Sequence, residues 1–179
     1  MIERIETPRL ILRTWRQSDL APLARMGADP RVMEFFPKTL SPAESLELYH
    51  TITRHYEQHG FCLWAVEVPG VTEFAGFVGL NVPTFDAPFM PCVEIGWRLA
   101  YEYWNHGYCT EAASAALHAG FTELGLEEIV SFTTPLNVRS IHVMEKIGMT
   151  RDPGGDFLHP RLPRDHRLSK HVLFRKRKL

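Results

Sequence analysis

Residues 92–113 read CVEIGWRLAYEYWNHGYCTEAA and combine a β-rich run with the start of a helix. Its first part, Cys92–Leu99, is rich in β-forming residues and predicts a strand. A loop at Tyr101–Gly107 follows, and then an alanine-rich helix. The apolar face of this helix is formed by Ala113, Leu117, Phe121 and Leu124. A helix N-terminus after a strand and a glycine gathers backbone N–H groups that attract anions. Gly107 therefore marks either an anion-binding turn or an ordinary left-handed turn.

Two further β-rich runs precede this stretch, at Phe61–Val68 and Phe74–Val82. Because short segments holding glycine and proline separate the three runs, we expect an antiparallel meander. Downstream, the pattern becomes strand, helix and strand. The expected elements are a strand at Glu128–Thr134, a helix at Val138–Ile147 closed by Gly148, and a last strand at Lys170–Lys176. This alternation predicts a crossover that pairs strands in parallel where the meander ends.

The N-terminal third of the chain predicts one strand and two helices. Arg9–Arg16 suits a strand, and Ser18-Asp19 offers an N-cap for a short helix that ends near Met26. The run Ser41-Pro42-Ala43-Glu44 starts a second helix, because it combines an N-cap, a proline at the first helical position and a capping-box glutamate. Taken together, the elements predict a single α+β domain over residues 1–179. We expect a mixed twisted sheet, with an antiparallel meander joined to a parallel βαβ half, flanked by helices.

Charge, cysteine and histidine content exclude several classes of protein. The chain has 20 Lys and Arg against 21 Asp and Glu, a formal charge of -1, which offers no field for nucleic acid or an anionic membrane. Met1–Thr14 carries charged residues throughout, which argues against a secretory signal, so we expect a cytoplasmic protein. The cysteines are too few and too widely spaced for a disulfide framework or a metal site. His55 and His59 lie four apart on the expected helix, yet no third zinc ligand is evident, and we expect a solvated face.

Five short motifs occur in one order along nearly the whole chain. They are TPRLILR at 7–13, EIGW at 94–97, WNHGYCTEA at 104–112, NVRS at 137–140 and EKIGM at 145–149. In this order they resemble the GNAT superfamily of acetyl-CoA-dependent N-acetyltransferases, and within it the branch of RimJ/RimL-like protein N-terminal acetyltransferases. The resemblance implies acetyl-CoA as co-substrate, no metal, and direct attack of an amine in a ternary complex.

The resemblance also implies where acetyl-CoA binds. The family's diphosphate signature, Gln or Arg, two residues, Gly, one residue and Gly or Ala, falls on Trp104, Gly107 and Cys109, so two of its three places differ. Backbone N–H groups would still cradle the diphosphate. The residues concerned are Asn105, His106, Gly107, Tyr108, Cys109 and Thr110. By the same resemblance, the backbone of Trp97 and Leu99 pairs with the pantetheine arm, where two parallel strands splay apart.

Two residues are candidates for proton transfer. Alternation along Cys92–Leu99 places Glu94 on the same strand face as Gly96. If this face lines the cleft, the Glu94 carboxylate could take the proton from the amine, directly or through water; otherwise it is a half-exposed glutamate on a sheet. The resemblance implies that Ser140 protonates the leaving thiolate and that Asn137 contacts CoA. The same two residues also suit an N-cap pair.

Two other residues of these motifs bear on the chemistry. Met144 stands where many members of the superfamily carry a tyrosine acid, which leaves that role to Ser140. Cys109 sits at a helix N-terminus that would lower the pKa of its thiol. No histidine base lies beside it in sequence, so we expect it to be structural rather than a nucleophile.

The acceptor is expected to be an N-terminal α-amino group of a protein or peptide. At pH 7 such a group, with a pKa near 7.7, is deprotonated about 15% of the time, against about 0.04% for a lysine near 10.4. A site without an obviously strong base therefore suits an α-amine better, which agrees with the RimL-like resemblance. The alternatives are a small-molecule amine such as a polyamine, aminoglycoside or amino acid derivative, or a CoA-binding sensor without turnover. Phe35 and Phe36, with the irregular segment Asp152–Leu168, would wall the acceptor pocket. Core packing of the phenylalanines and disorder of the segment are the alternatives, and monomer or homodimer stays open.

Overall fold

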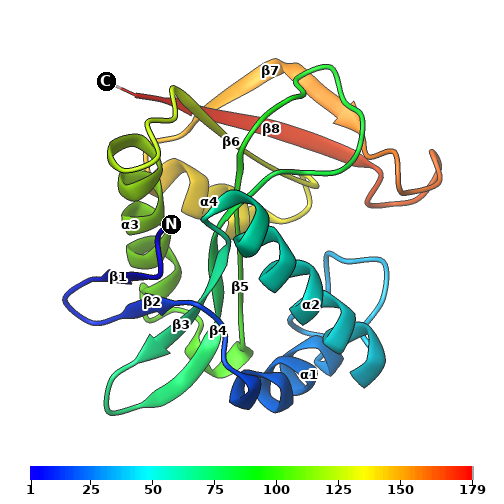
Figure 1. Ribbon diagram of the computed structural model, residues 1–179. Coiled ribbons are helices and arrows are strands. Elements are labelled where there is room, and N and C mark those ends of the chain that lie inside the picture. The colour runs from blue at the N-terminus through cyan, green and yellow to red at the C-terminus, as the bar shows by residue number, and fades with distance from the viewer. Residues whose placement is uncertain (179) are drawn as a thin grey trace.

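Eight strands form one sheet in the order β1-β2-β3-β4-β5-β6-β8-β7 (Figure 1). The computed structural model describes residues 1–178. The strands are β1 Arg4–Glu6, β2 Ile11–Arg13, β3 Leu63–Val68, β4 Thr72–Asn81, β5 Glu94–Leu99, β6 Glu128–Thr133, β7 Thr150–Leu158 and β8 Lys170–Arg177. The helices are α1 Leu20–Ala28, α2 Pro42–His59, α3 Tyr108–Thr122 and α4 Val138–Lys146, with short 3-10 turns at Gln17–Asp19 and Tyr101–Tyr103.

The sheet is mixed, as the sequence predicts. Strands β3, β4 and β5 form the antiparallel meander, and β5 then pairs with β6 in parallel through Glu94 and Val130. The remaining pairs, β6 with β8 and β8 with β7, are antiparallel. Parallel pairing among the described strands is thus confined to the β5–β6 junction, which is less than the parallel half expected from the alternation of elements.

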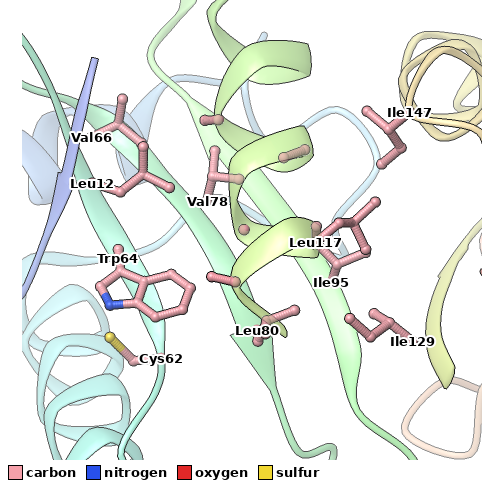
Figure 2. Close-up of a cluster of buried hydrophobic side chains, with 14 of the residues drawn as sticks. Leu12, Cys62, Trp64, Val66, Val78, Leu80, Ile95, Leu117, Ile129 and Ile147 are labelled. Carbon is pink, nitrogen blue, oxygen red and sulfur yellow. The ribbon is translucent and has the colours of Figure 1, made fainter. Parts of the chain in front are cut away.

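The helices cover both faces of the sheet. Alternate residues of β3 show this, because Trp64 and Val66 join the core cluster that contains α3, whereas Ala65 joins the cluster that contains Leu23 of α1. Figure 2 shows part of the larger cluster, with Val78, Leu80 and Ile95 of the sheet gathered around α3. Small α3 residues, Ala112, Ala113 and Ala116, are fully buried and let the helix lie close to β4 and β5.

The capping signals in the sequence are confirmed. Ser41 Oγ accepts from the Glu44 N–H at 3.2 Å, and the Glu44 carboxylate accepts from the Ser41 N–H at 2.8 Å. Gly60 ends α2 in the left-handed conformation. Both ends of this helix are therefore fixed by local interactions.

Three expectations need correction. The first strand is shorter than Arg9–Arg16 and pairs with β1, which the sequence did not indicate. The segment Asp152–Leu168 is not irregular throughout, because its first part lies in β7 and pairs with β8. The register shifts between Asp152 and Phe157, so a bulge absorbs the Pro153-Gly154-Gly155 run that hides the strand pattern. His55 does not lie on a solvated face: it is half-buried, with Nδ1 3.0 Å from the Phe61 carbonyl, and Nε2 accepts from the Val82 N–H.

A buried ion pair ties β2 to the start of α1. The Arg13 guanidinium donates two hydrogen bonds to the Asp19 carboxylate, at 2.8 and 2.9 Å. Both side chains are almost fully buried, at 4% and 2% exposure. The guanidinium also bonds Glu67 at 3.0 Å. Within residues 1–178, no helix has the length and apolar composition to cross a membrane.

We expect Asp19→Ala to lower the free energy of unfolding by about 3 kcal/mol, because it leaves the buried Arg13 charge with one carboxylate fewer. Asp29→Ala is the matched control. It removes an aspartate from the exposed Arg31, and it should cost less than about 1 kcal/mol. Urea denaturation of the three proteins at pH 7 measures both effects, and equal losses in the two variants would contradict the assigned role of burial.

Candidate active site

Strands β5 and β6 diverge directly after their first contact. The Val130 N–H donates to the Val93 carbonyl and the Ser131 hydroxyl donates to the Ile95 carbonyl, each at 2.9 Å. Their registered pairing is Glu94 with Val130, and in the described residues Gly96–Leu99 has no registered partner on the β6 side. A notch therefore opens in the middle of the sheet.

The backbone groups of Trp97 and Leu99 face this notch. The Ala100 N–H donates to the Ala75 carbonyl of the β4 side, and backbone groups alternate between the two sides of a strand. The carbonyls of Val93 and Ile95 point to the β6 side, so the next two odd-numbered residues do likewise. Trp104 Nε1 already occupies the Leu99 carbonyl at 2.8 Å.

The turn before α3 offers free N–H donors. Asn105 and Gly107 both take the left-handed conformation, with φ of 63° and 80°, and α3 begins at Tyr108. Among residues 1–178, no acceptor is found for the backbone N–H groups of residues 105–110. Left-handed residues that alternate with ordinary ones form a concave nest of N–H groups, and the helix dipole adds to its attraction for anions. The N–H groups that the sequence analysis expects to cradle a diphosphate are therefore not occupied by the protein itself.

Arg9 and Glu111 hold this turn in place, a feature that the sequence analysis missed. The Arg9 guanidinium donates to Glu111 at 2.7 Å and to the His106 carbonyl at 3.0 Å, and it lies over the Tyr108 ring. Thr7 Oγ1 also donates to Glu111, at 2.7 Å. In the sequence, only the Thr7-Pro8-Arg9 run hints at this contact. Arg9 and Glu111 are far apart along the chain, and only the fold brings them together.

A cavity of about 790 Å³ joins the turn, the notch and the far side of β5. It brings together twelve of the thirteen predicted site residues. These are Phe35, Phe36, Glu94, Trp97, Leu99, Asn105, Gly107, Tyr108, Cys109, Thr110, Asn137 and Ser140. His106 does not line the cavity; its ring is exposed, lies 2.7 Å from the Trp104 carbonyl through Nδ1, and stacks on Tyr108.

Glu94 lies in this cavity on the β5 face that it shares with Gly96 and Arg98. Desolvation raises the pKa of its carboxyl to about 8, although the neighbouring Asn81 side chain lowers it in part. A carboxylate with a pKa near 8 is a far stronger base than an ordinary glutamate.

Ser140 and Asn137 form the expected N-cap pair at the start of α4. The Ser140 N–H donates to Asn137 Oδ1 at 3.2 Å. Ser140 Oγ accepts from Trp97 Nε1 at 3.1 Å and from Asn137 Nδ2 at 3.2 Å. A hydroxyl has two acceptor lone pairs and one proton, so with both lone pairs occupied the proton is left for a third group. Met144 is buried in the core cluster and offers no hydroxyl.

The expectation of a low thiol pKa at Cys109 is wrong. Burial raises the pKa of this thiol well above its ordinary value, which outweighs its place at the helix N-terminus. Cys109 is therefore a small structural residue under the turn, and thiolate chemistry does not arise there.

The other end of the cavity has an aromatic wall that the sequence analysis also missed. Phe132 of β6, His159 and His171 line it, with ring centroids 5.0 Å apart for the two histidines. Phe157 packs behind them, 5.5 Å from both Phe132 and His171. Burial, helped by the neighbouring His171 and Arg161, lowers the pKa of His159 to about 4, so this wall is uncharged at neutral pH.

The model of the acetyltransferase (GNAT) domain matches residues 9–150 of the chain. The chain belongs to the GNAT family. The uncharacterized protein YkkB of Bacillus subtilis is 33% identical over 147 residues, covering 82% of this chain and 84% of YkkB. A GNAT-family acetyltransferase from Bacillus anthracis has a TM-score of 0.80 and 25% identity, covering 97% of this chain and 98% of that one. The ribosomal-protein-S5-alanine acetyltransferase of Vibrio fischeri, at 18% identity over 98% of this chain and 97% of its own, shares the fold, with a TM-score of 0.76.

This GNAT protein is an acetyl-CoA-dependent N-acetyltransferase. GNAT acetyltransferases use acetyl-CoA as co-substrate, and the residues present fit it: the free N–H groups before α3 suit a diphosphate, and the notch leaves backbone groups for an extended arm. The described residues contain no cluster of three or more His, Cys, Asp or Glu that could hold a metal ion.

We expect Gly107→Ala to weaken acetyl-CoA binding about tenfold. A side chain disfavours the left-handed conformation, and its Cβ would lie 3.3 Å from Arg9 Nη2, so the turn must rearrange. Gly125→Ala is the matched control, because Gly125 has a φ of 67° and open space around it, far along the chain from the cradle. Calorimetric titration with CoA measures both; equal affinity in the two variants would rule out the turn as the cradle.

Proposed function

We propose that this acetyltransferase acetylates the α-amino group of a protein or peptide N-terminus, by direct attack on the thioester in a ternary complex. The observation that carries the proposal is the place of Glu94 in the cavity beside the notch, where burial raises the pKa of its carboxyl to about 8. An α-amino group has a pKa near 7.7, close to that of Glu94. A proton shared between the two therefore costs little in either position, whereas a lysine near 10.4 holds its proton against this base.

In this mechanism, acetyl-CoA supplies an activated acetyl group. The N–H groups of residues 105–110 bind the diphosphate, and the backbone of Trp97 and Leu99 orients the pantetheine arm. Glu94 accepts the proton of the attacking amine, directly or through water, and Ser140 donates its hydroxyl proton to the leaving sulfur. Phe35 and Phe36 form part of the acceptor wall, in the cavity that Phe132 and its neighbours also line.

One solved structure of the same fold supports a protein as acceptor. It is the ribosomal-protein-S5-alanine acetyltransferase of Vibrio fischeri, which has the same architecture at low sequence identity. A mass-spectrometric screen with acetyl-CoA and mixed N-terminal peptides, polyamines, aminoglycosides and lysine-containing peptides with blocked N-termini tests the proposal. Acetylation confined to small molecules or to lysine would overturn the acceptor class, and binding of acetyl-CoA without any product would indicate a sensor.

The rate should depend on ionisation of Glu94. Because this carboxyl must be deprotonated to act as a base, kcat/KM is expected to rise with pH and to level off above about 8. Glu94→Gln should lower kcat by roughly 10²-fold or more and abolish the rise of kcat/KM with pH that is due to Glu94. Two peptide acceptors whose amines differ in pKa separate the titration of the enzyme from that of the substrate. An unchanged profile in Glu94→Gln would exclude the glutamate as base.

Ser140→Ala is expected to lower kcat by about 10-fold or more with little change in the KM of acetyl-CoA, since it removes the proton donor and keeps the helix. Trp97→Phe leaves the serine but removes one hydrogen bond that orients it, so a smaller loss of kcat should result. Steady-state kinetics with a thiol-detecting reagent gives both values. If Ser140→Ala raises only the KM of acetyl-CoA and leaves kcat unchanged, the serine binds the co-substrate and does not protonate its sulfur.

A further inference from the structure

Arg98 of β5 is a charged side chain at the acceptor side of the cavity. It lies on the same strand face as Glu94, with Gly96 between them, and it lines the cavity. Its guanidinium carbon lies over two aromatic rings, 4.1 Å from the centre of Phe36 and 5.3 Å from that of Phe77. These rings hold the guanidinium plane in position.

This arginine has no anionic partner in the described residues. Its Nε and Nη1 atoms are buried without a hydrogen-bond acceptor, and it forms no ion pair. The other arginines that line the cavity are all engaged: Arg31 with Asp29, Arg139 with Glu34 and Arg161 with the Thr84 hydroxyl. Burial lowers the pKa of Arg98 to about 10, so it remains charged at neutral pH.

An unpaired buried charge destabilises a protein, because the lost hydration is not replaced. A guanidinium in such a position is preorganised for a carboxylate, which it binds through charge-assisted hydrogen bonds. Nη2 is the guanidinium nitrogen that the protein does not enclose, so it would make the first hydrogen bond to the carboxylate. The aromatic stacking keeps the side chain in place while its electrostatic partner is absent.

The spacing along β5 leaves room for an extended partner. Glu94 and Arg98 are four positions apart on the strand, so their Cα atoms lie roughly 13 Å apart. Gly96, which lies between them, leaves open space above the strand. A Cβ placed on it would meet only Leu63 at 3.7 Å and Glu94 Oε1 at 3.9 Å. The Glu94 carboxyl lies over Gly96, on the way to Arg98, so the two charged groups are closer than their Cα atoms. An extended peptide advances about 3.3–3.6 Å per residue, which brings an acidic second residue toward Arg98 when the N-terminal amine lies at Glu94.

We propose that Arg98 is a specificity-determining residue that binds a carboxylate of the acceptor, and that the preferred acceptors are peptides with an acidic residue directly after the N-terminal residue. This inference rests on the proposed function and goes beyond it by naming the sequence class of the substrate. Glu94 engages the reacting amine, and Arg98 engages the acidic side chain across Gly96.

The test compares peptides that differ only at position 2, carrying Glu, Gln or Lys, with the wild-type enzyme, Arg98→Met, Arg98→Lys and Arg31→Met. We expect kcat/KM of the wild type to favour the Glu peptide over the Gln peptide at least tenfold. Arg98→Met should remove this preference through a higher KM for the Glu peptide, with the Gln peptide changed less than about twofold. Arg98→Lys should retain part of the preference, and Arg31→Met, which removes an ion-paired arginine of the same cavity, should retain it in full.

Thermal melting without substrate separates a binding role from a structural one. Since Arg98→Met removes an uncompensated charge and keeps a long apolar side chain against Phe36 and Phe77, it should melt no lower than the wild type. A clearly lower melting temperature would show that Arg98 is structural, and a raised KM for acetyl-CoA would show that it binds a phosphate of the co-substrate. Either result overturns the inference.

The remaining outcomes separate this inference from the proposed function. Acetylation of all three peptides at equal rates would overturn the role of Arg98 and leave the proposed function standing. Acetylation of no peptide N-terminus would overturn the proposed function and the inference that depends on it.

Discussion

The divergence of β5 from β6 after Glu94 shapes the whole candidate site. Buried backbone N–H and C=O groups are nearly always paired, and leaving them open inside a sheet is costly. Here the cost is confined to Gly96–Leu99, because Glu94 and Val130 still pair and the Ser131 hydroxyl reaches across to Ile95. Helix α3 and the buried side chains around Ile95 hold β5 against β4, so the notch is a fixed feature of the core.

In the proposed mechanism, one strand organises both halves of the reaction. The backbone edge of β5 that carries Trp97 and Leu99 faces the notch, where the co-substrate arm would lie. The side chains of Glu94 and Arg98 project from the strand face where we propose that the acceptor binds. A six-residue strand can serve both purposes because backbone groups lie in the plane of a sheet and side chains lie perpendicular to it.

The sequence predicts the features that arise from local chemistry. The Ser41 cap, the Gly107 turn and the Asn137–Ser140 pair are set by residues a few positions apart, and each forms as expected. Features that depend on distant residues are missed. The bulged strand β7 forms only by pairing with β8. The turn before α3 is held by the contact of Arg9 with Glu111, which are far apart in sequence. The pKa of Cys109 depends on burial, which outweighs the helix terminus that the sequence reveals.

The cavity concentrates groups that the rest of the protein leaves unsatisfied. Unpaired backbone in the notch, free N–H groups before α3, a carboxyl with a raised pKa and an arginine without an anion all lie along one surface. Each lowers the stability of the free protein, and each would be relieved by a bound molecule that carries the complementary group. Binding to the folded state alone stabilises it by RT ln(1 + [L]/Kd), so such a site links substrate affinity to stability. Elsewhere, the buried pair of Arg13 and Asp19 shows that the fold does compensate charges that have no ligand to meet, which makes the exception at Arg98 informative.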